Sequence, residues 1–146
     1  MGSWVRDEEI DALAQELREI DQGAMHSDLG ETRHWFQGRE AYFDVLVDCD
    51  LELTEDDDGI PMPHTIPRWM QVTLRARVLT WERGGAVKSG RTDETEVRET
   101  HATPARLVDA DLTVDPRVLQ VVLAILERRP DEPVLAAALT ALRAAL

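Results

Sequence analysis

The chain has 146 residues, of which 29 are acidic and 16 basic, so its formal net charge at pH 7 is -13. Such a charge repels nucleic acids and anionic membranes and attracts basic partners. The single cysteine, Cys49, excludes an internal disulfide and a metal site built from several cysteines. A chain of this length can bury about two-thirds of its unfolded surface, and we expect residues 1–146 to form one α+β domain.

No apolar run in the sequence approaches the roughly 20 residues that span a bilayer. The first residues also lack a basic segment followed by an apolar one, the pattern of a secretory signal. We therefore expect a cytoplasmic protein without a membrane partner.

The first predicted element is an amphipathic helix over Asp7 to Gln22. Acidic residues fill its first turn, where they complement the positive end of the helix dipole, and Gly23 is a natural stop. Apolar residues recur at helical spacing, at Ile10, Leu13, Ala14, Leu17 and Ile20. The weakly periodic segment that follows contains one candidate edge strand, Trp35 to Gln37.

Two alternating stretches, Ala41 to Leu53 and Pro67 to Glu82, predict the central antiparallel strands of the sheet. Apolar residues take the odd positions of the first stretch and the even positions of the second. A slip of one residue would turn a strand over, so an odd position of the first must lie opposite an even position of the second. One face of the sheet is then dry and includes Cys49, which we interpret as an inert packed thiol.

The second face of these strands mixes aromatic, charged and amide side chains. One interpretation is cross-strand ion pairs with partly covered aromatic rings. The other is a recognition surface, because Trp, Tyr and Arg are enriched at interface hot spots. The candidate partner-binding residues on this face are Tyr42, Asp44, Asp48, Trp69, Gln71, Arg75, Arg77 and Trp81.

The segment between the two stretches, Thr54 to Ile66, contains a run of carboxylates followed by Gly59. With Gly59 at the sixth position of a helix-loop-helix calcium loop, the first and twelfth positions are Thr54 and Thr65, so essential carboxylates are missing. We interpret the segment as a solvated acidic hairpin loop and predict no metal site.

Two further strands complete a predicted sheet of three to four strands. Gly84 and Gly85 indicate a tight turn into a polar strand over Val87 to Arg98, and the alternation in Leu107 to Val114 predicts another strand.

The C-terminal third predicts a helical hairpin. Asp115 and Pro116 are an N-cap and first helical residue, Pro130 ends this helix, and Asp131 caps the next. The second helix is rich in alanine, which permits close packing either inside the domain or against a second copy of the chain.

Catalytic signatures are missing from the sequence. It has no Gly-x-Ser-x-Gly elbow, phosphate-binding loop, Gly-x-Gly-x-x-Gly turn or His-Glu-x-x-His pair, and its four histidines have no ligand spacing. One catalytic or small-ligand arrangement remains as an alternative, with Asp44 and Asp48 beside Arg75 and Arg77 on the second face. We expect no cofactor.

These observations predict a non-enzymatic protein-protein interaction module, an adaptor or chaperone-like protein whose acidity favours a basic partner. An alternative within binding functions is an acidic inhibitor or immunity-type protein that neutralises a basic enzyme.

Overall fold

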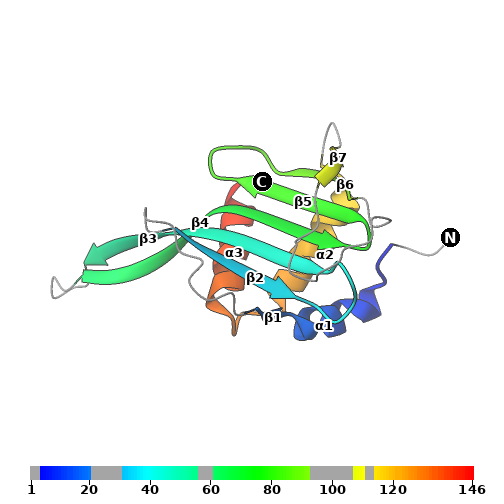
Figure 1. Ribbon diagram of the computed structural model, residues 1–146, viewed down its shortest axis with the longest axis horizontal. Coiled ribbons are helices and arrows are strands. Elements are labelled where there is room, and N and C mark those ends of the chain that lie inside the picture. The colour runs from blue at the N-terminus through cyan, green and yellow to red at the C-terminus, as the bar shows by residue number, and fades with distance from the viewer. Residues whose placement is uncertain (1–3, 21–30, 56–60, 93–106, 111–113) are drawn as a thin grey trace.

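The computed structural model describes residues 4–20, 31–55, 61–92, 107–110 and 114–146. In this part of the chain, one helix is followed by an antiparallel sheet and then by two helices (Figure 1). This order confirms the predicted α+β class, the N-terminal helix and the C-terminal pair of helices. No helix in these ranges is long and apolar enough to cross a membrane.

Helix α1 covers Asp7–Glu16. It begins where the sequence indicates, and the Glu9 carboxylate accepts a hydrogen bond from the Arg6 backbone N–H at 2.9 Å. The prediction that it continues to Gln22 is wrong. At Leu17 the backbone becomes extended, with φ -67° and ψ 125°, and Arg18–Glu19 pairs as strand β1.

The described strands form one sheet whose spatial order, β1 to β7, follows the chain. After β1 come β2 (Glu31–Gln37), β3 (Asp44–Glu55), β4 (Pro61–Leu74), β5 (Arg77–Glu82), β6 (Lys88–Thr92) and β7 (Leu107–Ala110). Because β1 has only 2 residues, the body of the sheet is six-stranded. The predicted three to four strands are too few.

The largest correction concerns Pro67 to Glu82, which we predicted as one strand. The chain reverses at Arg75 and Ala76, whose φ angles are 50° and 67°, and β5 pairs back onto β4. Two central residues at positive φ are typical of the type I′ turn, which suits the twist of a β-hairpin. Such turns usually contain Asn-Gly or Asp-Gly, so an Arg-Ala pair carries no recognisable turn signal.

This reversal changes which side chains share a face. Directly opposed residues in an antiparallel pair lie on the same face, and Leu79 is opposite Val72 while Trp81 is opposite Met70. Leu79 and Trp81 therefore belong to the core face. They do not lie on the second face, where the one-strand prediction placed them.

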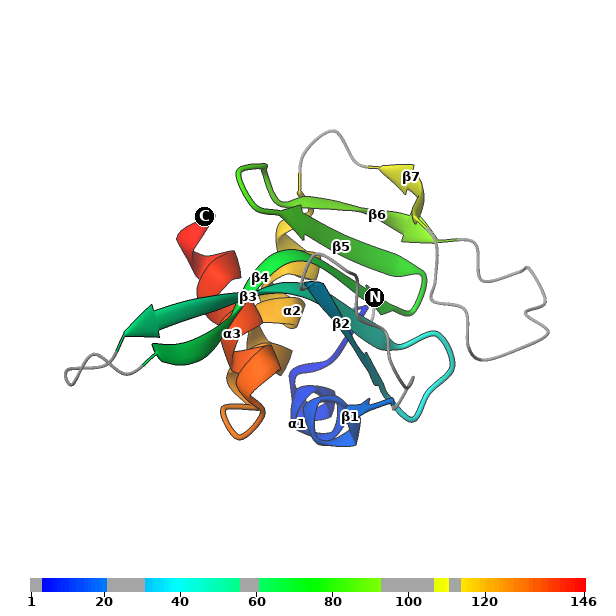
Figure 2. The same cartoon turned by 60° about the vertical axis from the view of Figure 1, so that its left-hand side comes forward.

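Helices α2 (Pro116–Glu127) and α3 (Pro133–Ala144) pack with α1 on one face of the sheet (Figure 2). The predicted cap of α2 is confirmed, since the Asp115 carboxylate accepts from the Arg117 N–H at 2.9 Å. The cap of α3 is Glu132, whose carboxylate accepts from the Val134 N–H at 3.3 Å. The prediction of Asp131 as this cap is wrong.

The core lies between the helices and the dry face of the sheet. As predicted, odd positions of β3 oppose even positions of β4 as far as Asp48, with Val45 opposite Val72 and Val47 opposite Met70. Beyond the register shift after Asp48 this parity changes, and Cys49 lies opposite Pro67. Cys49 belongs to the same cluster and is 1% exposed. The helices contribute Ile10, Leu13, Val118, Val122, Ile125, Leu126, Leu135 and Leu142.

Candidate interaction surface

Strands β3 and β4 extend beyond their neighbours and project from the sheet as a two-stranded ribbon (Figures 1 and 2). The pairing of β2 with β3 ends at Glu31 opposite Asp50, and that of β4 with β5 ends at Trp69 opposite Glu82. Beyond these positions β3 and β4 pair only with each other among the described strands, as far as Glu55 opposite Pro61. We call residues 51–55 and 61–66 the arm.

The sequence of the arm and its connecting loop is acidic. From Asp48 to Pro67 there is no lysine or arginine, and the acidic residues are Asp48, Asp50, Glu52, Glu55, Asp56, Asp57 and Asp58. Strand β4 also contains Pro61, Pro63 and Pro67. Proline lacks the N–H needed for a ladder hydrogen bond, so it hinders the addition of another strand to the β4 edge.

A cluster of side chains on the second face lies where the arm joins the sheet. The Arg33 guanidinium donates to both carboxylate oxygens of Asp48, at 2.6 and 2.9 Å. It also lies 5.4 Å above the centroid of the Trp69 ring, a cation–π contact. Since Arg33 is opposite Asp48, and Asp48 is opposite Trp69, the three residues form one row across three strands.

A second group of charges adjoins this row. Asp50 accepts a hydrogen bond from Arg83 at 3.0 Å and lies 3.7 Å from Arg68. The pairing of β3 with β4 shifts between Asp48 and Cys49, leaving Arg68 as the extra residue of a bulge. We call Arg33, Asp48, Asp50, Arg68, Trp69 and Arg83 the base cluster. The exposed fractions of its three arginine side chains are 39–44%.

The centre of the second face is buried. Asp44 is 2% exposed and Gln71 8%, and Leu46 and Thr73 between them are equally inaccessible. Trp35 is opposite Leu46 and is also buried. Asp44 and Gln71 therefore lie on the predicted face but cannot contact a partner in this conformation.

The remaining predicted residues lie elsewhere. Trp81 is in the core, and Arg77 begins β5, opposite Leu74. Tyr42 is half-buried in the turn between β2 and β3, with φ 61°. Of the eight candidates, the structure places only Asp48 and Trp69 together at the arm base.

Arg75 is the centre of a separate network of hydrogen bonds and ion pairs. Its guanidinium donates to the carboxylates of Glu9 and Glu40 at 3.1 to 3.2 Å and to the Trp4 carbonyl at 3.2 Å. The hydrogen bonds from Arg75 and from the Arg6 backbone lower the pKa of Glu9 to about 2. The same two carboxylates raise the pKa of Arg75. This network ties the β4–β5 turn to α1 and to the β2–β3 turn.

The alternative arrangement of Asp44, Asp48, Arg75 and Arg77 is therefore not assembled. Asp48 is paired with Arg33, and Arg75 is paired with Glu9 and Glu40, so Asp48 and Arg75 are held by other partners and not by each other. Within the described ranges, no group of three or more His, Cys, Asp and Glu side chains is arranged so that it could hold a metal ion. His34 lies 2.9 Å from Glu19. The other histidines and the acidic run tested for calcium lie outside the described side chains.

Sequence reasoning missed four members of the base cluster, Arg33, Asp50, Arg68 and Arg83. Arg33 lies on β2, where charged and aromatic residues obscure the alternation of apolar and polar positions. Arg68 lies close to Asp50 because the bulge makes it the extra residue of β4. Arg83 reaches Asp50 because β5 turns back beside β4. The chain matches no protein-family model, no curated protein and no solved structure.

Proposed function

We propose that this protein is a non-enzymatic, cytoplasmic protein-protein interaction module that binds a basic partner through the arm and the base cluster. The observation that carries the proposal is the arm itself. A two-stranded ribbon projects from the sheet and pairs only with itself among the described strands, and the sequence of the arm and its connecting loop contains Glu52, Glu55 and Asp56 to Asp58 without one arginine or lysine.

The base cluster supplies a second class of contact. Trp69 and Arg33 are of the residue types that dominate interface hot spots, and they are already stacked. The bidentate pair with Asp48 holds the guanidinium in place, so little side-chain entropy is lost when a partner covers it. The prolines of β4 disfavour strand addition at that edge, which supports recognition by side chains.

An adaptor or chaperone-like role is the leading form of this proposal. The acidity of the arm also favours a second form, an inhibitor that neutralises a basic enzyme, because opposite charges speed association. The partner's own activity separates the two: an inhibitor abolishes it at stoichiometric ratio, whereas an adaptor leaves it intact.

A tagged pull-down from lysate of the source organism at low and high salt, analysed by mass spectrometry, identifies the partner. We expect a stoichiometric basic protein that is lost more readily at high salt. Trp69→Ala is expected to weaken the purified complex at least about tenfold, since central aromatic residues carry much of the binding energy. Isothermal titration calorimetry measures this loss.

The matched control is Leu146→Ala, which removes a large apolar side chain that is 61% exposed in the C-terminal segment, outside the proposed surface. It should leave the affinity unchanged. Asp56→Asn, Asp57→Asn and Asp58→Asn combined should slow association and flatten its salt dependence. A correctly folded Trp69→Ala protein that binds every partner with unchanged affinity would contradict the proposed surface.

A further inference from the structure

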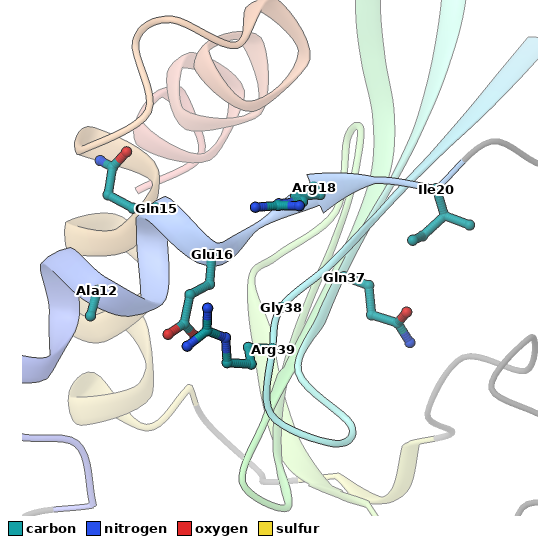
Figure 3. Close-up of a pocket in the computed structure, with 8 residues that line it drawn as sticks. All are labelled: Ala12, Gln15, Glu16, Arg18, Ile20, Gln37, Gly38 and Arg39. Atoms are coloured by element: carbon teal, nitrogen blue, oxygen red, sulfur yellow. The ribbon is translucent and has the colours of Figure 1, made fainter.

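An open groove lies at the Gln37 end of β2, between the end of α1, strand β1 and the turn from β2 to β3. Its volume is about 620 Å³, within the range typical of small-molecule sites. Figure 3 shows that Arg18 extends from β1, and Arg39 from the turn, toward the α1 side of this groove. Two guanidinium groups from different elements thus line one hollow.

Neither guanidinium has a protein partner within the described ranges, although the chain has an excess of carboxylates. Arg33, Arg75 and Arg83, by contrast, all pair with aspartate or glutamate. A single arginine at an isolated surface position would be unremarkable, but two arginines against the one carboxylate of Glu16 leave this groove with an excess of positive charge in an acidic protein.

Arg18 and Arg39 are not needed to cap the C-terminal end of α1. The carbonyls at the end of α1, those of Ala14 and Leu17, accept hydrogen bonds from Arg129 at 2.9 and 2.7 Å. The negative end of the helix is therefore already neutralised by another residue. With respect to the described part of the chain, Arg18 and Arg39 remain available to a ligand.

The turn that carries Arg39 is anchored. The Gly38 N–H donates to the Phe43 carbonyl at 2.9 Å, and the Phe43 ring is fully buried. A Cβ at Gly38 would lie 2.1 Å from that ring, so only glycine permits this close approach. The backbone of Arg39 is consequently held at the rim of the groove before any ligand arrives.

We propose that this groove binds a small organic anion, bearing a carboxylate or phosphate group, through Arg18 and Arg39. Planar guanidinium groups bind both kinds of oxyanion by paired hydrogen bonds. Glu16 lines the same groove and opposes the binding of an anion by charge repulsion. The site is independent of the proposed partner surface, since it shares no residue with the arm or the base cluster.

The test is a titration of ¹⁵N-labelled protein followed by NMR, with inorganic phosphate, glycerol 3-phosphate and citrate as separate probes. Sodium chloride at matched ionic strength is the reference. We expect saturable shifts at the amides of Arg18, Gly38 and Arg39 below about 10 mM of at least one probe, as for a Kd near 1 mM or tighter. A response to both phosphates alone identifies the phosphate class, and a response to citrate alone the carboxylate class.

Variants of opposite expected sign separate binding from misfolding. Arg18→Ala and Arg39→Ala should each weaken binding by about fivefold, as expected for loss of a charged hydrogen-bond donor in an open groove. Glu16→Gln should strengthen it, because it removes a repulsive charge. Arg91→Ala, which removes the same charge from an exposed position on β6, should change nothing.

Two results would overturn the proposal. One is the absence of saturable shifts for all three probes. The other is equal affinity in the wild type and in the Arg18→Ala, Arg39→Ala double variant, which would place the anion elsewhere. Because both arginines are exposed, the variants should keep the wild-type melting temperature.

Discussion

Arg75 joins several separate segments of the chain. It contacts Trp4 before α1, Glu9 within α1 and Glu40 in the β2–β3 turn, while its own backbone forms the β4–β5 turn. The indole N–H of Trp4 donates to the Arg75 carbonyl at 3.3 Å. A side chain predicted to face a partner therefore serves mainly to connect elements of the fold.

This network makes stability depend on pH through Glu9. The folded-state pKa is about 2 against the usual 4.5, so Glu9 stabilises the fold above pH 4.5 and loses that contribution as the pH falls toward 2. We expect Glu9→Gln to lower the urea midpoint at pH 7 and to differ progressively less from the wild type below pH 4.5.

The control for this prediction is Glu8→Gln, whose side chain is 73% exposed. It should have little effect at either pH. A constant difference between Glu9→Gln and the wild type from pH 7 to pH 2 would show that Glu9 acts through packing instead of its charge.

At the scale of elements, the β4–β5 turn decides which face each residue of β5 occupies. Ala76 holds φ 67°, a left-handed conformation that costs an L-residue about 1 kcal/mol or more. Ala76→Gly should therefore raise the free energy of unfolding by up to about 1 kcal/mol, after allowing for the extra entropy of glycine in the unfolded chain. Urea denaturation measures the gain.

The same substitution in a helix provides the matched control. Ala12 is exposed within α1, where glycine costs about 1 kcal/mol relative to alanine. Ala12→Gly should destabilise the protein, opposite in sign to Ala76→Gly. Loss of stability in both variants would contradict the left-handed geometry assigned to the turn.

The sequence was sufficient to predict the elements whose signals are local. Asp115 and Pro116 mark the start of α2, and alternation in β3 identifies the face that holds Val45 and Val47. The turn at Arg75 and Ala76 was missed because alternation runs on through a two-residue turn without a break. Only the strand pairing shows that Trp81 returns to the core.

The candidate surface was harder to predict than the fold. Asp48 and Trp69 could be assigned to one face from parity alone, and the structure brings them together. Arg33, Arg68 and Arg83 reach the same place through pairing with β2, a bulge and a hairpin. These are relations between distant segments, and a local pattern does not contain them.

At the scale of the whole molecule, the rate at which a reagent labels Cys49 measures unfolding of the protein. It is 1% exposed, and burial, with the nearby Asp48 and Asp50 carboxylates, raises its pKa to about 12. Since the thiolate is the reactive form, labelling requires the sheet and helices to separate. We expect a disulfide reagent to label the native protein slowly and at a rate that rises with urea in step with unfolding.

The fully unfolded protein in urea provides the reference rate for a free thiol. Labelling of the native protein at that rate, without denaturant, would show that Cys49 is accessible through local motion and would contradict its position in the core.

The sequential order of the sheet has a consequence for how the chain acquires its structure during synthesis. Each described strand pairs with the strands next to it in the chain, so pairing can proceed as the strands are made, at a small cost in loop entropy. Helices α2 and α3, which cover the dry face, are made afterwards. Until they emerge, the face that includes Val47 and Met70 has no cover from them, and a nascent chain stalled before α2 would be a substrate for chaperones.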